Sequence, residues 1–158
     1  MRPHDIERLG LVASLARLCE SFGRTHSLRV EFQSAGAEGI PIASEHAVNI
    51  YRITQEALAN AGQHSHARAV NVALVRSHPD LILRITDDGV GFDVEKRHAR
   101  TTDGRGMGLL GMEERAAILG AALAVTSRTG KGTQIKLTMR VDSKEQPDGT
   151  AEDHSPSG

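Results

Sequence analysis

The sequence predicts an α/β fold of two layers, a two-layer sandwich in which a mixed β-sheet is covered by helices on one face. After a first helix, the predicted elements follow in the order strand, helix, strand, strand, helix, strand, strand. These helices are enough to cover one face of one sheet. The length of 158 residues suits a single domain, and 39% hydrophobic with 25% charged residues is typical of a globular chain. Because only 3% of the residues are aromatic, the core must consist of aliphatic side chains.

Hydrophobic periodicity predicts three helices. In residues 6–22 the apolar side chains recur three and four positions apart, which places them on one face of a helix. The longest helix is predicted to begin at Ser44, a good N-cap residue, and to end near Gly62. A third helix is predicted over residues 109–119.

Five segments alternate between apolar and polar residues, which is the pattern of half-buried strands. The second and third of them flank SHPD at residues 77–80, whose composition is typical of a turn, so an antiparallel hairpin is predicted there. The predicted strands are residues 28–33, 70–74, 81–85, 123–127 and 134–141.

Charge and composition exclude several classes of protein. Residues 142–158 are rich in Ser, Pro, Gly and acidic residues and are predicted to form a disordered acidic tail. The tail holds five acidic residues against one lysine, so the rest of the chain carries a net charge of +3. That charge is too weak to indicate nucleic-acid binding. With no long apolar run and no signal peptide, we expect a cytoplasmic chain without membrane contact. The single cysteine, Cys19, is interpreted as a buried hydrophobe.

Glycines gather where the chemistry is expected. Nine of the sixteen glycines lie between Asp87 and Gly132, in two main clusters, DDGVGF at residues 87–92 and GRGMGL at residues 104–109. The first cluster follows a predicted strand and begins with a carboxylate. The second opens a predicted helix, whose free amides can hold phosphate. Its spacing is GxGxGL and it follows a polar loop, so it does not fit the dinucleotide-binding fingerprint.

A third candidate element lies on the longest helix. Glu56 and Asn60 are four residues apart and therefore share one helix face. A carboxylate there can orient a reactant, and an amide oxygen can ligate Mg²⁺. Taken alone, such a pair is more typical of a solvated contact on a helix surface.

The ordered set of motifs resembles the GHKL ATPase superfamily, and within it the catalytic ATP-binding domains of sensor histidine kinases. YRITQEALANAGQHSHA at residues 51–67 resembles the family's N box, and the two glycine clusters resemble its glycine boxes. TGKGTQIKL at residues 129–137 resembles the closing strand. The segments at residues 2–22 and 111–120 resemble the nitrate-sensor and DesK type of kinase. The resemblance covers nearly the whole chain to Val141.

The resemblance implies a fold, an activity and cofactors. Residues 25–141 would form the Bergerat ATP-binding fold, and residues 1–24 would be the helix that follows a dimerisation hairpin. The activity would be that of a protein histidine kinase that uses ATP and Mg²⁺. Residues 90–105 would be a mobile lid over the nucleotide.

The resemblance also implies roles for individual residues. Asn60 would ligate the Mg²⁺ that bridges the ATP phosphates, and Glu56 would position the transferring phosphate or act as a base. Asp87 would accept a hydrogen bond from the adenine amino group, with Thr133 supporting the same contact. Backbone amides of the second glycine box would hold the phosphates. The cofactor-binding residues implied in this way are His64, Asp87, Gly89, Val90, Gly91, Arg105, Gly106, Met107, Gly108, Leu109 and Thr133.

One position departs from the family pattern. Members usually carry Lys or Arg before the histidine of the N box, whereas here Gln63 precedes His64. Without this cation the affinity or turnover would be lower, unless Arg100 or Arg105 supplies the charge. His64 and His66 form the only HxH arrangement, which we interpret as structural or close to the nucleotide, with metal binding as the alternative.

The expected partners follow from what the motifs leave out. His4-Asp5 resembles an acceptor box, but the register of residues 2–22 fits the later segment better. The phosphoacceptor histidine would therefore lie on a dimerisation domain outside this chain, with a NarL-type response regulator downstream and a monomer as the isolated state. Two alternatives remain open: a GHKL serine kinase of the anti-sigma-factor class, and a non-catalytic nucleotide-binding or interaction module.

Overall fold

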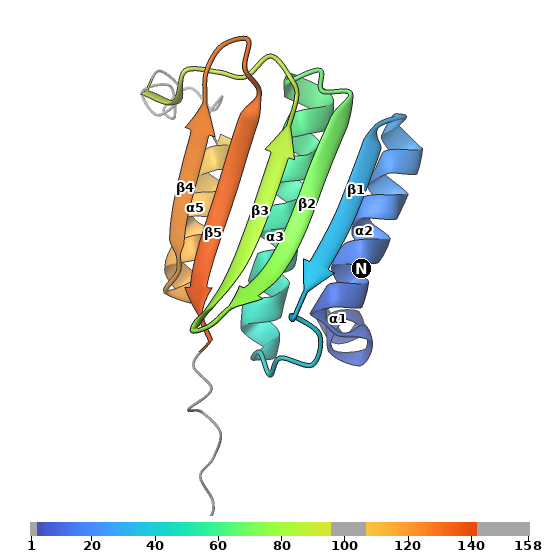
Figure 1. The fold of residues 1–158 in the computed structure, drawn as a ribbon, viewed down its shortest axis with the longest axis vertical. Helices are drawn as coiled ribbons and strands as arrows, with labels where there is room; N and C mark the ends of the chain where they lie inside the picture. Colours follow the sequence, from blue (N-terminus) through green and yellow to red (C-terminus); the bar gives the residue numbers. More distant parts are fainter. Residues whose placement is uncertain (1–2, 96–106, 142–158) are drawn as a thin grey trace, which may run out of the picture.

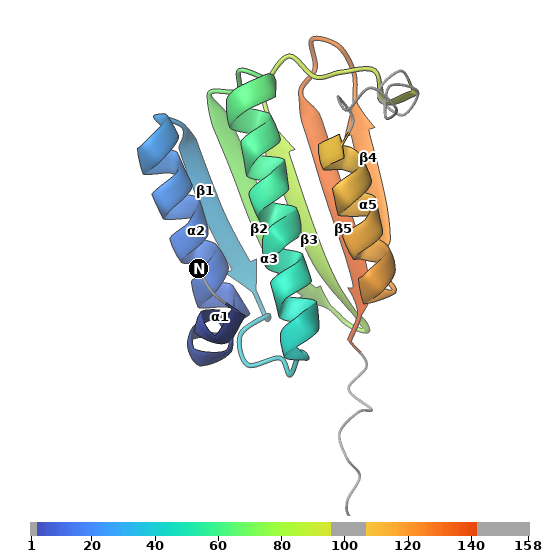
Figure 2. The same cartoon turned by 180° about the vertical axis from the view of Figure 1, so that it is seen from behind.

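The computed structural model of the chain describes residues 3–95 and 107–141. A five-stranded sheet, ordered β1-β2-β3-β5-β4, forms one layer, and helices pack against one of its faces to form the other. Figures 1 and 2 show the sheet from its open face and from its helix-covered face. The predicted fold class, a mixed sheet covered on one face, is thereby confirmed.

The five strands are those that the alternating patterns predicted. Strand β1 pairs with β2 in parallel, and every other pair in the sheet is antiparallel. The hairpin of β2 and β3 turns at residues 78–79, within the predicted turn. The strands are β1 Arg29–Ala35, β2 Ala69–Ser77, β3 Asp80–Asp87, β4 Ala122–Ser127 and β5 Thr133–Arg140.

The first predicted helix is divided in two at Gly10. Helix α1 spans Pro3–Leu9 and helix α2 spans Leu11–His26. Gly10 has a φ of 87°, which a helix does not contain and which glycine adopts without strain. Hydrophobic periodicity did not predict this break, because the apolar spacing continues across it.

The longest helix differs from the prediction at both ends. Helix α3 spans Ser44–Ala59, so Ser44 is its first residue rather than its N-cap. The Ser44 hydroxyl donates a hydrogen bond to the Glu7 carboxylate of α1 instead of capping the helix. After Ala59 the coil widens into a π-helical turn, η1, over Asn60–His64. Such turns within helices are frequent at functional sites.

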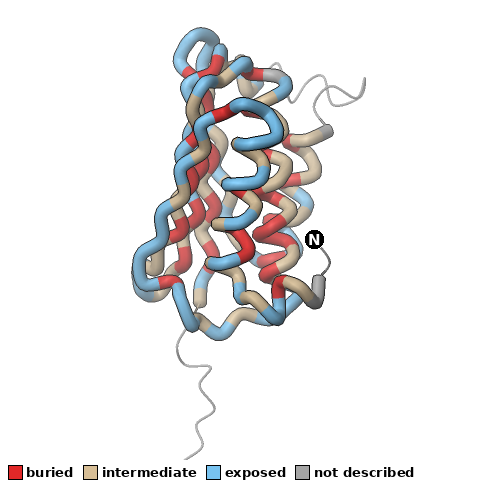
Figure 3. Tube along the Cα trace, turned by 90° about the vertical axis from the view of Figure 1, so that its right-hand side faces the viewer, coloured by how far each residue is buried: buried red, intermediate tan, exposed pale blue. Residues whose placement is uncertain are grey.

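The core lies between the two layers. Figure 3 shows the buried positions concentrated between the sheet and the helices. Leu74, Leu83 and Leu137 stand side by side on neighbouring strands and are at most 2% exposed. Ile53 and Leu58 of α3 and Leu15 of α2 have no exposed surface. Complete burial of one such side chain contributes about 1.5–3 kcal/mol.

Helix α5, over Met107–Leu119, completes the layer beside α3. Its Met112 and Ala116 are buried in the same core, as is Cys19 of α2, for which burial raises the thiol pKa to about 12. The interpretation of Cys19 as a buried hydrophobe is therefore confirmed. No helix within the described ranges is long and apolar enough to cross a membrane. The predicted acidic tail, residues 142–158, lies outside the described residues.

Candidate functional site

A narrow pocket opens between the helix layer and the ends of three strands. Its walls are mainly apolar, and its polar groups come from η1, the end of β3 and the start of β5. The free volume is about 20 Å³, roughly the space of one water molecule, so a larger ligand requires its walls to move apart. The lining residues are Ala57, Asn60, Ser65, Ile85, Asp87, Phe92, Leu109, Met112, Val125, Thr133 and Ile135.

Asp87 is the acidic group of this pocket. It is the last residue of β3, and its Oδ1 accepts a hydrogen bond of 2.8 Å from the Gly89 amide. Burial raises the pKa of Asp87 above its ordinary value, and hydrogen bonds from the backbone of Gly89 and Thr133 counteract part of this effect. A carboxylate at the end of an apolar slot selects a flat, largely apolar ligand that carries a hydrogen-bond donor.

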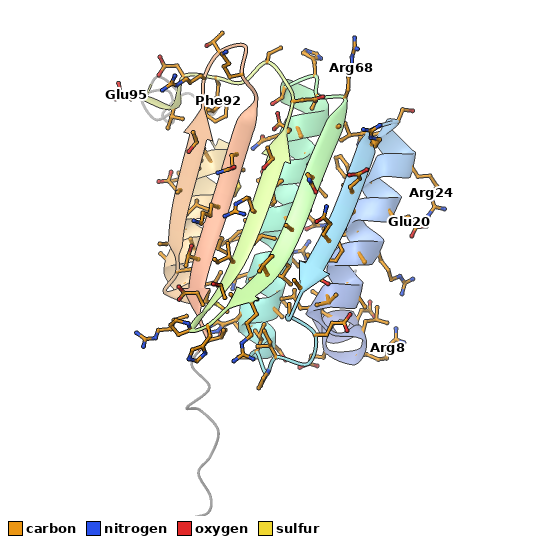
Figure 4. The ribbon with its side chains drawn as sticks, in the orientation of Figure 1. Arg8, Glu20, Arg24, Arg68, Phe92 and Glu95 are labelled. Atoms are coloured by element: carbon orange, nitrogen blue, oxygen red, sulfur yellow. The ribbon has the colours of Figure 1, made fainter. Side chains whose placement is uncertain are left out.

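The neighbouring Asp88 binds backbone amides and does not line the pocket. Its Oδ1 accepts hydrogen bonds from the Arg68 and Ala69 amides, at 2.8 and 3.1 Å, at the start of β2. These bonds, that from Ala69 foremost, lower the pKa of Asp88. Arg68 lies at the same end of the sheet as Phe92 (Figure 4). Of the two consecutive acids, only Asp87 lines the pocket, as the sequence analysis assumed.

Two glycines let the backbone cross closely at the edge of the pocket. Gly91 has a φ of 68°, and a Cβ there would lie 2.1 Å from the Arg128 carbonyl oxygen. Gly132 has a φ of 78°, and its Cβ would lie 2.2 Å from the Asp87 carbonyl oxygen. Both positions therefore require glycine for packing within the protein. This packing explains the glycine at position 91 without a ligand, so the predicted approach of a ligand ring to Gly91 stays a prediction.

Other residues of the first glycine box attach the loop to the helix layer. The Val90 amide donates to the Ser65 carbonyl oxygen at 2.8 Å, while the Val90 side chain is 50% exposed. Gly89 is close enough to Ser65 that a Cβ would lie 2.4 Å from its carbonyl oxygen. Phe92 lines the pocket, and Glu95 points away from the sheet (Figure 4).

Glu56, Asn60 and Gly108 lie close together where α5 begins, and Asn60 also lines the pocket. A Cβ on Gly108 would lie 3.0 Å from Glu56 Oε1 and 3.5 Å from Asn60 Oδ1, so the first turn of α5 faces both side-chain oxygens. The first amides of a helix have no partner within it and attract anions. Glu56 also lines an adjoining groove of about 410 Å³ between α2, α3 and α5.

This oxygen-rich corner fits Mg²⁺. One carboxylate and one amide oxygen are ligands that this ion accepts, since it commonly keeps several waters and takes the rest from a phosphate. A metal site made wholly of protein groups is not indicated, because no cluster of three His, Cys, Asp or Glu side chains occurs in the described part of the chain. The sequence-based alternative of a metal site at His64 and His66 stays a prediction, because the side chain of His64 lies outside the described residues.

The structure brings together most of the predicted site residues that it describes. Asn60, Asp87, Leu109 and Thr133 line the pocket, Gly108 lies beside the Glu56 and Asn60 oxygens, and Gly89, Val90 and Gly91 belong to the loop that follows Asp87. Arg105, Gly106 and the lid from residue 96 onward lie outside the described residues, as do the side chains of His64 and Met107.

Sequence reasoning missed two residues of the site, Ser65 and Ser127. Ser65 is buried and directly follows the π-helical turn. Ser127 ends β4 and lies opposite Thr133 in the register of the sheet. The register in which β4 pairs with β5 would have identified Ser127, but this register cannot be predicted from the sequence alone.

Comparison with known proteins shows the family to which this chain belongs. The family of histidine kinase-, DNA gyrase B- and HSP90-like ATPases matches residues 45–143, which is more than half of the chain. This protein therefore belongs to that ATPase family.

Curated relatives point in the same direction. The chain is 32% identical over 138 residues to the signal transduction histidine-protein kinase/phosphatase DegS of Bacillus subtilis, and 36% identical over 144 residues to the sensor histidine kinase ComP of the same organism. These alignments cover 86% and 89% of this chain but only 35% and 18% of DegS and ComP. The resemblance to the catalytic domains of sensor histidine kinases is confirmed.

Solved structures agree on the fold. The histidine kinase domain of a blue-light activated histidine kinase from Erythrobacter litoralis superposes with a TM-score of 0.66 at 21% identity, over 87% of this chain and 69% of that one. A longer structure of the same kinase gives a TM-score of 0.67 at 23% identity, over 89% of this chain and 45% of that one.

Proposed function

We propose that this chain is the catalytic domain of a cytoplasmic histidine kinase, which binds Mg-ATP and transfers the γ-phosphate to a histidine on a separate dimerisation domain. One observation carries the proposal. In a chain of the ATPase family, the half-buried Asp87 and Asn60 line one apolar pocket, and Asn60 and Glu56 face the first turn of α5. We propose that the surroundings of Asp87 are the adenine end of a nucleotide site and that the oxygens of Glu56 and Asn60 mark its phosphate end.

The adenine end supplies shape and a charged acceptor. Ile85, Val125 and Ile135 offer apolar contact to a flat ring, and the Asp87 carboxylate accepts a hydrogen bond from the exocyclic amino group. A hydrogen bond to an ionised acceptor contributes about 1.5–3 kcal/mol. The pocket must widen to admit the ring.

The phosphate end supplies neutralising charge and orientation. Backbone amides at the start of α5, beginning with Met107 and Gly108, would hold phosphate oxygens, and Asn60 would ligate Mg²⁺. When bound, Mg²⁺ neutralises the charge that develops on the phosphate oxygens. His64, Arg105 and Gly106 are proposed to add contacts here on the strength of the family motifs.

The transfer itself needs little covalent chemistry from this domain. The bond between the γ-phosphorus and the bridging oxygen of ADP breaks as a bond to an imidazole nitrogen of the acceptor histidine forms. Glu56 orients the incoming imidazole or accepts the proton that its nitrogen releases. Positioning and charge neutralisation supply most of the rate. A response regulator of the NarL type would then take the phosphoryl group from the histidine.

Titration calorimetry of ATP into the purified chain, with and without Mg²⁺, tests the proposal. We expect binding that Asp87→Asn reduces by at least tenfold, because the new amide places a donor against the adenine amino group. Asn60→Asp should alter the dependence on Mg²⁺ and weaken the binding of metal-free ADP, because the new carboxylate repels the phosphates when no cation lies between them. A folded Asp87→Asn variant with wild-type affinity would refute the adenine site.

Phosphotransfer distinguishes kinase from binding module. Radiolabelled ATP and a supplied dimerisation domain of a relative should give phosphohistidine, which is stable to alkali and labile to acid. Transfer to serine of a partner protein would favour the anti-sigma-factor class. Tight ATP binding without transfer to any acceptor would favour a non-catalytic module, for which the absence of a cation at Gln63 is the motivation.

A further inference from the structure

Ser127 occupies a hydrogen-bond junction behind the adenine end of the pocket. Its hydroxyl oxygen lies 2.9 Å from the Phe92 amide nitrogen, 3.0 Å from the Gly132 carbonyl oxygen and 2.8 Å from Thr133 Oγ1. Three segments thus converge on one hydroxyl: the loop after β3, the turn before β5 and β5 itself. Ser127 does not line the pocket, whereas Thr133 does.

The chemistry of a hydroxyl group assigns a direction to each of these bonds. A serine hydroxyl has one proton to donate and two lone pairs with which to accept. The Phe92 amide can only donate, and the Gly132 carbonyl oxygen can only accept. Because Gly132 is buried, leaving that oxygen without a donor would be costly, so the Ser127 proton belongs there.

The direction of the remaining bond follows. The Ser127 hydroxyl donates its proton to the Gly132 carbonyl oxygen and accepts from the Phe92 amide with one lone pair. It can therefore only accept a hydrogen bond from the Thr133 hydroxyl. The single proton of the Thr133 hydroxyl is therefore used up, and its oxygen offers lone pairs to the pocket. Thr133 is 8% exposed and pairs with Asp87 across the sheet, so two acceptors stand side by side on this wall.

We propose that Ser127 is a positioning residue that holds the Thr133 hydroxyl as an acceptor and thereby makes the pocket select 6-aminopurine over 6-oxopurine nucleotides. The inference rests on the proposed function and adds a source of specificity to it. A 6-aminopurine presents N–H donors directly to this wall. A 6-oxopurine presents a carbonyl oxygen at the same place and meets only acceptors.

Removal of Ser127 should relax this selectivity. In Ser127→Ala the Thr133 hydroxyl is free to rotate and donate, so it can satisfy a 6-oxo group. We expect the ratio of ATP affinity to inosine triphosphate affinity to fall by about tenfold, the size of one hydrogen bond whose direction has changed. Inosine triphosphate is the appropriate probe because it keeps the ring shape and the triphosphate.

The experiment is a double-mutant cycle measured by titration calorimetry with both nucleotides. Ser127→Ala and Thr133→Val should each lower the ratio, and their combination should lower it no further than Thr133→Val alone, because Ser127 acts through Thr133. Ser127→Thr keeps the hydroxyl and should restore the ratio. Thr126→Ala removes a hydroxyl from the exposed face of the same strand and should change nothing.

Several outcomes would overturn the inference. A wild-type ratio in folded Ser127→Ala excludes the proposed role, and so does a wild-type ratio in Thr133→Val if the first variant does not fold. If Ser127→Ala lowers the affinity ratio equally in the wild type and in Thr133→Val, then Ser127 does not act through Thr133. The effect would then be assigned to Phe92 and the loop that it belongs to. Failure of the wild-type chain to bind ATP would refute the proposed function itself, and the inference with it.

Discussion

Asp87 illustrates how binding and stability oppose each other at a single residue. Burial raises the pKa of its carboxyl in the folded chain, so ionised Asp87 destabilises the fold. Between the ordinary pKa and the raised folded value, the folded state binds more protons than the unfolded state. The contribution of Asp87 to the free energy of unfolding therefore falls as pH rises through this window and stays low above it.

Asp87→Asn should accordingly remove a stability penalty while it removes the acceptor of the proposed adenine contact. At pH 7.5 we expect the midpoint of urea unfolding of the ligand-free variant to equal or exceed that of the wild type. The advantage should shrink as the pH falls through the window, because the wild-type carboxyl then becomes neutral as well. Urea titrations at a series of pH values measure the difference in stability between the variant and the wild type. A difference that favours the variant less at pH 7.5 than at acidic pH would contradict the prediction.

The motif residues were predictable from sequence, but their immediate surroundings were not. Asp87, Glu56 and Asn60 stand at positions that a spacing or a strand end marks, and the structure places Asp87 and Asn60 in the pocket and Glu56 beside Asn60. The hydroxyl junction at Ser127 depends on the pairing of Thr133 with Ser127 across β4 and β5. Such a register is set by the turn and the core together, and no local pattern encodes it.

At the scale of elements, the position of α5 along α3 determines how Gly108 faces Glu56 and Asn60 at the proposed phosphate end. Arg115 of α5 donates a hydrogen bond of 3.1 Å to Oδ1 of Asn49 on α3. Asn49 is 6% exposed, and its amide group also donates to the Glu45 carbonyl oxygen at 2.9 Å. This bond lies about two turns of α5 beyond Gly108, which faces Glu56 and Asn60.

Arg115→Ala should therefore impair both stability and phosphate binding. Loss of the partner of a buried amide oxygen costs about 1–3 kcal/mol in the free energy of unfolding. Because α5 is then less firmly fixed, we expect the affinity for ATP to fall more than the affinity for adenosine. Urea unfolding and calorimetry with both ligands measure the two effects.

The chain offers a matched control for this prediction. Arg24 pairs with Glu20 at 2.9 Å on α2, but both side chains are more than 70% exposed. Arg24→Ala should change the free energy of unfolding by less than about 0.5 kcal/mol. If Arg115→Ala has an effect as small as that, or weakens adenosine and ATP equally, then the Arg115–Asn49 bond does not position the phosphate end.

The elements themselves were largely predictable, and their exceptions have local causes. All five strands and the α3 and α5 segments follow from periodicity because one face of each is buried in a single core. The break at Gly10 leaves the apolar spacing intact and shows only in a positive φ. The turn at Asn60–His64 is too short for its wider period to show in the apolar pattern, so the change from α to π is invisible in the sequence.

At the scale of the whole molecule, the N-terminal helices share the core of the ATP-binding domain. Residues 1–24 and 25–141 were predicted as separate segments, yet Leu15 and Cys19 of α2 are at most 1% exposed within the same hydrophobic cluster as the sheet. Figure 2 shows α2 beside α3 on the covered face. We propose that the two segments unfold together.

Leu15→Ala tests this cooperativity. Truncation of a fully buried leucine lowers the free energy of unfolding by about 2–5 kcal/mol. If the chain unfolds as one unit, circular dichroism and amide protection in β3 and β5 should show the same reduced stability, although neither strand belongs to the N-terminal segment. Arg17→Ala on the exposed face of α2 serves as the control and should stay within about 0.5 kcal/mol of the wild type. Unchanged protection in β3 and β5 of Leu15→Ala would instead show that α2 detaches on its own and that the sheet keeps the nucleotide pocket without it.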